Sequence, residues 1–163
     1  MSSQVLTTQL LSRPDLAAWT RFLRAHAAVT RQLSARLESQ HGLTLSDFDV
    51  LIQLYSAPER RLRRIDIARL VLLSPSGITR LLDGLERAGW VEKVRCESDA
   101  RVVYAALTAE GTRKCEEARV THLADVEELF SSHFSGGEHE ALGELLGRLP
   151  LAETSESCKA GDA

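Results

Sequence analysis

One stretch, SPSGITRLLDGLERAGWVEK at positions 74–93, constrains the fold more than any other part of the chain. Ser74 is a favoured helix N-cap, Pro75 suits the first helical position, and Gly89 is placed to end the helix. The apolar residues between them recur at the spacing of one buried helix face: Ile78, Leu81, Leu82 and Leu85. The sequence therefore predicts a capped amphipathic helix whose polar face is available to a partner.

A short helix is predicted before this stretch, and two strands are predicted at and after its end. A short helix with its own apolar face is expected from residue 65 to about 72, and two strands over 90–95 and 102–107 form a hairpin around a polar loop. Two short helices joined by a tight turn and followed by a hairpin describe a winged helix-turn-helix. In such motifs the second helix, called the reading helix below, lies in the major groove of DNA.

Helices are predicted on both sides of this core, so the expected fold is mainly α with a small β-hairpin wing (α+β). One long helix runs from Pro14 to about residue 40, and a second is capped near Thr44 and stopped by Pro58. A further helix runs from Thr108 to about residue 133, and a last one covers 138–149. The expected organisation is an N-terminal dimerisation helix (1–42), a winged helix-turn-helix (43–107), C-terminal dimerisation helices (108–150) and a disordered tail (151–163).

Charge is divided unevenly along the chain. The net charge is −3, yet residues 58–103 hold ten Lys or Arg against seven Asp or Glu, so this segment is +3 and the remainder −6. A basic centre in an acidic chain is typical of a nucleic-acid footprint, although a solvated mixed-charge surface is the alternative.

Several classes of protein are disfavoured by what the sequence lacks. It has no signal-peptide pattern, no apolar run long enough for a membrane span, and an odd number of cysteines without paired spacing, which together favour a reducing cytoplasm. Its five histidines form no HxxxH pair, so no metal is expected, and no cofactor either. The absence of GxSxG, HExxH and a glycine-rich phosphate loop argues against an enzyme.

The polar face of the second helix supplies most of the expected double-stranded DNA contacts. Ser and Thr hydroxyls bond to bases or phosphates, and Arg can bond two acceptors of guanine at once. In the wing, Arg101 is expected to enter the minor groove, and Asp99 to hold Arg101 or the turn. The full set of expected DNA-binding residues is Ser74, Pro75, Ser76, Gly77, Thr79, Arg80, Arg87, Arg95, Asp99 and Arg101.

The run IDIARLVLLSPSGITRLLDGLERAGWVEKVRCESDARVVYAALTAEG resembles the winged-helix core of MarR-type transcriptional regulators. The match is close over about 44–115, and the flanking helices agree in layout. Family members often carry two adjacent arginines in the wing, where this chain has Ala100 and Arg101. The resemblance implies a bacterial homodimer, usually a repressor, that binds an inverted-repeat operator and is released by a small, often phenolic, molecule or by oxidation.

A dimer is also expected on physical grounds, because one reading helix contacts few bases and the outer helices carry more apolar surface than a winged helix covers. The resemblance places a ligand between the dimerisation helices and the DNA-binding lobe, although each candidate alone is more often a packing residue. The candidates are Trp19, Phe22, His26, Phe48, Ile52, Tyr55 and Arg69.

Two other functions remain open at this point. A winged helix can serve only protein–protein contact, although that role gives no reason for Ser76, Thr79 and Arg80 to begin the second helix. A redox-responsive regulator is also possible through Cys96, which follows Arg95 in the wing. Cys115 has a spacing suited to burial, and Cys158 lies in the tail.

Overall fold

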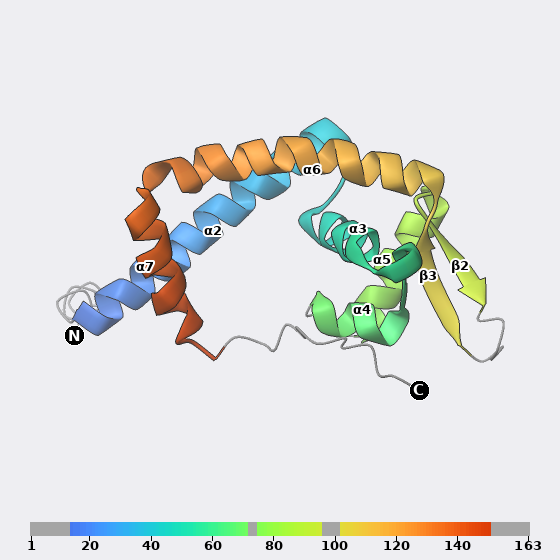
Figure 1. Ribbon diagram of the computed structural model, residues 1–163, viewed down its shortest axis with the longest axis horizontal. Coiled ribbons are helices and arrows are strands. Elements are labelled where there is room, and N and C mark those ends of the chain that lie inside the picture. The colour runs from blue at the N-terminus through green and yellow to red at the C-terminus, as the bar shows by residue number, and fades with distance from the viewer. Residues whose placement is uncertain (1–13, 72–74, 96–101, 151–163) are drawn as a thin grey trace, which may run out of the picture.

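The computed structural model describes residues 14–71, 75–95 and 102–150 (Figure 1). A mainly helical chain carries one small sheet, which confirms the expected fold class. The elements are α2 (Pro14–His41), α3 (Leu45–Ser56), β1 (Arg61–Arg63), α4 (Arg64–Leu70), α5 (Pro75–Arg87), β2 (Val91–Arg95), β3 (Val103–Leu107), α6 (Ala109–Leu129) and α7 (Gly136–Gly147), with short 3-10 turns at Pro58–Arg60 and Ser131–His133.

The helix boundaries agree with the predicted ones where a cap defines them. Thr44 and Asp47 form a capping box at the start of α3, with the Asp47 amide donating to Thr44 Oγ1 at 3.1 Å. The long helix predicted over 108–133 was wrong at its end, because α6 stops at Leu129 and Phe130 leaves helical geometry. The last helix, expected over 138–149, instead begins at Gly136 behind the N-cap Ser135 and ends at Gly147.

The sheet has three antiparallel strands in the order β1-β3-β2. The hairpin of β2 and β3 was predicted, and the structure pairs Val94 with Tyr104 in it. Strand β1 was not predicted. β1 pairs with β3 so that Leu62 lies opposite Ala105, which ties the start of α4 to the wing. A three-residue strand of sequence RLR carries too little alternation to be recognised, so the prediction of a two-stranded sheet was wrong.

One apolar core unites the winged-helix lobe with the ends of α2 and α6. Its fully buried members include Leu51 and Leu54 from α3, Ile67 from α4, and Ile78 and Leu85 from α5. From the other side, α2 contributes Leu37 and α6 contributes Cys115 and Ala118. Figure 1 shows α6 running along the top of the lobe and onward beyond it, beside α2. No helix in the described parts of the chain is long and apolar enough to cross a membrane.

The end of α5 is joined to the start of α6 through a tight junction. Gly89 adopts φ +76°, and its amide and that of Trp90 donate to the carbonyls of Glu86 and Leu85, closing α5 in a Schellman motif. Thr108 caps α6 by accepting from the Gly111 amide at 2.9 Å, while its hydroxyl donates to the Gly89 carbonyl at 2.7 Å. These hydrogen bonds fix the end of α5 to the start of α6.

Candidate nucleic-acid interface

The predicted reading helix has the two faces that its sequence indicated. Ile78, Leu82 and Leu85 are buried in the core, which fixes the rotation of α5 about its axis. The opposite face leaves Arg80 and Arg87 exposed and Thr79 partly exposed. Among the expected DNA contacts, Ser74, Asp99 and Arg101 lie outside the described residues, while Pro75, Ser76 and Gly77 fall in the first turn of α5.

A group that the sequence analysis did not select reaches this face from the preceding helix. Arg64, the first residue of α4, donates from Nη1 to Thr79 Oγ1 at 3.3 Å. Its neighbour Arg63 is paired with Asp66, with Nε and Oδ2 2.7 Å apart. The cluster RRLRR at 60–64 was visible in the sequence, but the contact with Thr79 joins residues 15 apart and needs the packed motif to bring them together.

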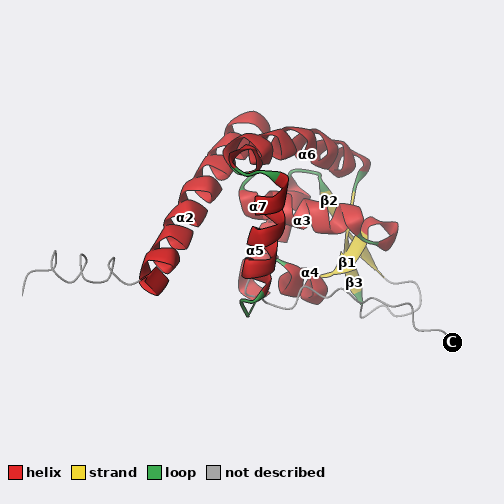
Figure 2. Ribbon diagram, turned by 60° about the vertical axis from the view of Figure 1, so that its left-hand side comes forward, coloured by secondary structure: helices red, strands yellow, loops and turns green. Residues whose placement is uncertain are grey.

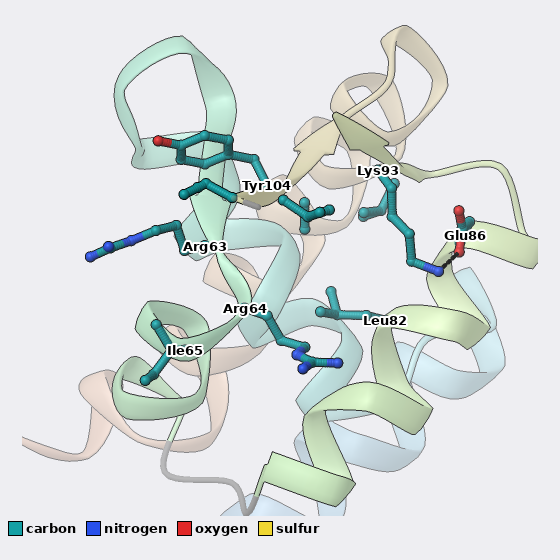
Figure 3. A pocket seen from close by; sticks show the side chains of 11 residues that line it. Arg63, Arg64, Ile65, Leu82, Glu86, Lys93 and Tyr104 are labelled. Atoms are coloured by element: carbon teal, nitrogen blue, oxygen red, sulfur yellow. Dashed lines mark hydrogen bonds and ion pairs between the residues drawn. The ribbon is translucent and has the colours of Figure 1, made fainter. Parts of the chain in front are cut away.

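The wing is held to α5 by a second set of charges. Lys93 on β2 places its Nζ 2.6 Å from Glu86 Oε2 (Figure 3). The same Nζ lies 3.4 Å from Asp83 Oδ1. The hydrogen bond that Lys93 donates to Glu86, with a smaller contribution from Asp83, raises the pKa of Lys93. Arg95 is exposed at the end of β2, on the side from which the wing loop leaves. The reading helix and the first wing strand are thus linked across their polar faces.

The proposed ligand residues are not brought together within one chain. Trp19, Phe22 and His26 stack along an exposed face of α2, with ring centroids 6.1 and 6.2 Å apart. At about 1.5 Å per residue they lie roughly 22 Å (His26) to 33 Å (Trp19) along the helix from His41, the end of α2 that packs on the lobe.

The α3 members of that group are in contact with α6 instead. Phe48 is buried with its ring centroid 4.7 Å from that of His122, and the Tyr55 hydroxyl donates to Glu116 at 3.0 Å. Ile52 is partly buried against the same core. Arg69 is exposed on α4.

Cysteine burial was predicted correctly for Cys115, which has no exposed surface. Desolvation raises the pKa of its thiol to about 11, so it stays protonated and unreactive at neutral pH. Cys96 and Cys158 lie outside the described residues.

A buried helix-turn-helix core, an exposed polar face on its second helix and a β-hairpin beside it define a DNA-binding protein of the winged helix-turn-helix class. The comparisons with known proteins agree. A family model described as MarR family matches residues 41–102. The HTH-type transcriptional regulator YkoM of Bacillus subtilis is 33% identical over 125 residues, covering 77% of this chain and 79% of the relative.

The solved structure of Sco3205, a MarR family regulator from Streptomyces coelicolor in complex with DNA, superimposes with a TM-score of 0.76 at 25% identity. The match covers 80% of this chain and 82% of that one. The HTH-type transcriptional repressor YetL of Bacillus subtilis is 30% identical over 108 residues, 66% of this chain and 64% of the relative. The chain belongs to the MarR family: it is a transcriptional regulator that binds DNA, and the family is not enzymatic.

Proposed function

We propose that this protein is a cytoplasmic, homodimeric repressor that binds an inverted-repeat operator and is released by a small molecule. The observation that carries the proposal is the division of α5 into a buried apolar stripe and an exposed face with Thr79, Arg80 and Arg87. Hydroxyl and guanidinium groups on the outer face of a helix-turn-helix reading helix are the groups that recognise base edges and phosphates. Repression is supported by the relative YetL, which is named a transcriptional repressor.

Apolar side chains on the outer helices support the dimer. Large apolar residues are exposed on α2, on α6 and around α7: Trp19, Phe22, Leu23, Val120, Leu123, Phe130, Phe134, Leu145 and Leu149. Val120 and Leu123 are 66% and 55% exposed, on a face of α6 turned away from the core. Apolar surface gathered in this way marks a protein interface. Figure 2 shows α2 extending away from the lobe, and Figure 1 shows α7 turning down from the far end of α6, so a second copy has helices on which to pack.

The two-fold symmetry of such a dimer implies the form of the operator. Two α5 helices on one face of the duplex read half-sites one helical turn apart, or about 10 bp between centres. The same symmetry makes the operator an inverted repeat.

Aromatic side chains on α2 form the candidate site for the effector. We infer a small, phenol-like molecule that binds at the dimerisation helices, where Trp19, Phe22 and His26 present stacked, exposed rings on α2. Aromatic rings of this kind suit an apolar ring with a polar edge.

Sedimentation of the protein alone and with operator DNA tests the dimer. Wild type is expected at twice the chain mass, with two chains on each operator. Leu123→Glu introduces a charge into the proposed interface and should produce monomers. For the protein without DNA, Ile65→Glu makes the same change at a residue 56% exposed on α4, outside the dimerisation helices, and should remain dimeric. A wild-type monomer at micromolar concentration contradicts the proposal.

A further inference from the structure

A hollow of about 520 Å³ lies between the end of β1, the start of α4, the C-terminal half of α5 and strands β2 and β3 (Figure 3). Apolar residues from α5 and the sheet form part of its lining, including Leu82, Val91 and Ala105. Two exposed apolar residues also line it, Ile65 at 56% and Val103 at 43% exposure. The hollow is therefore a partly apolar surface open to solvent, beside the reading helix.

Three basic side chains line the same hollow, and they differ in their partners. Arg63 pairs with Asp66, and Lys93 pairs with Glu86 and Asp83. Within the described parts of the chain, Arg64 instead donates to the neutral hydroxyl of Thr79. Figure 3 shows its guanidinium reaching from α4 toward α5. The carboxylate of Glu86 also lines the hollow, but it is paired with Lys93, so Arg64 is the lining cation without a carboxylate partner among the described residues.

The hollow lies between α5 and the wing strands, the two elements expected to contact DNA, and this position indicates which part of the DNA contacts it. If α5 lies in the major groove and the wing in the adjacent minor groove, one sugar-phosphate strand crosses between them. That strand passes the surface that joins α5 to β2 and β3, which is the hollow. Its charge is complementary to the guanidinium, and its deoxyriboses are apolar enough to contact Ile65 and Val103.

We propose that the hollow seats the DNA strand between the major and minor grooves, with Arg64 as its phosphate-binding group. This inference rests on the proposed operator binding by α5. Through its bond to Thr79, Arg64 also connects the phosphate contact to the reading helix. A phosphate held at Arg64 fixes how deeply and at which base step α5 enters the groove, so the residue positions the contacts that specify sequence.

A salt titration of operator binding tests the role of Arg64. Arg64→Ala should lower the slope of log K against log salt by about 0.9 for each phosphate no longer neutralised, or about 1.8 for a dimer. Arg64→Gln keeps a donor for Thr79 without the charge and should lose the same slope, whereas Arg64→Lys should retain most of it. Arg119→Ala removes an equal charge from an exposed site on α6 and should keep the wild-type slope.

Three results separate the possible failures. A wild-type slope for Arg64→Ala on a bound operator overturns the proposal and leaves operator binding intact. An unchanged slope with an altered preference at one base position also overturns it, because Arg64 would then read a base. If the wild-type protein binds no DNA sequence specifically, the proposed function itself is wrong. Because Arg64 is exposed, its variants should keep the wild-type melting temperature. That result would show that a lowered salt slope does not come from unfolding.

Discussion

Replacing Gly111 by alanine tests the junction that joins the reading helix to α6. Gly111 lies in the first turn of α6, where helix propensity alone favours alanine by about 1 kcal/mol. A Cβ at this position would stand 1.9 Å from the carbonyl oxygen of Trp90 and 2.7 Å from its carbonyl carbon. Both atoms belong to the backbone between α5 and β2, so a side-chain rotation cannot relieve the overlap.

The expected result is a net loss of stability. Relieving the overlap costs about 1–3 kcal/mol, as for overpacked cores. It also strains the 3.1 Å hydrogen bond from the Thr108 amide to the Trp90 carbonyl, worth about 1 kcal/mol. After the gain in helix propensity, the free energy of unfolding should fall by about 1–3 kcal/mol. For a chain of this size the melting temperature should drop by roughly 3–10 °C.

Thermal and urea unfolding at one fixed protein concentration measure this change, because the proposed dimer would make stability depend on concentration. Gly84→Ala is the matched control: its added Cβ would meet nothing within 4 Å in α5, so it should stabilise by about 0.5–1 kcal/mol. If Gly111→Ala is as stable as wild type, the close approach of α6 to Trp90 is not a feature of the folded protein.

Four further changes test the interface and the packing. Arg80→Ala should cost about 1–3 kcal/mol of operator affinity and relax the preference at one symmetric pair of positions, and an equal loss on all sequences would make it a phosphate contact. Arg101→Ala should erase any preference for A·T-rich flanks in binding assays, and equal affinity on both flanks would keep the wing off DNA. Arg36→Met removes the cation 2.6 Å from Asp125, which is 8% exposed, and should lower the midpoint of urea unfolding, because the buried carboxylate loses its partner; an unchanged midpoint would show that the pair contributes nothing. Desolvation lowers the pKa of His122, so the unfolded chain takes up its proton first as the pH falls through about 6.5, and stability is lost. His122→Gln should therefore lose less melting temperature than wild type between pH 7.5 and 5.5, and parallel losses would assign the acid sensitivity elsewhere.

Local signals were sufficient to predict most helices and the wing hairpin. Thr44, Thr108 and Gly89 each act within a few residues of the chain, so the caps and the stop that they form can be recognised before any packing is known. The buried stripe of α5 follows for the same reason, because a helix repeats its faces every 3.6 residues.

Contacts between distant residues could not be predicted in the same way. Strand β1 exists because Leu62 lies opposite Ala105 in the folded chain, and its own three residues carry no strand pattern. Arg64 contacts Thr79 only after α4 and α5 have packed, so the basic cluster at 60–64 gave no sign of which arginine reaches α5. Apolar faces on the outer helices were expected, but the sequence does not show which of their residues stay exposed in the folded chain.

Selection of bound sites from random DNA tests the central claim most directly, because it reports sequence, symmetry and spacing together. The account predicts an enriched inverted repeat with half-site centres about 10 bp apart and guanine preferences that weaken at one symmetric pair in Arg80→Ala. A selected motif without two-fold symmetry would contradict the dimeric reading of DNA by α5, and the absence of any enriched motif would contradict sequence-specific binding by that helix.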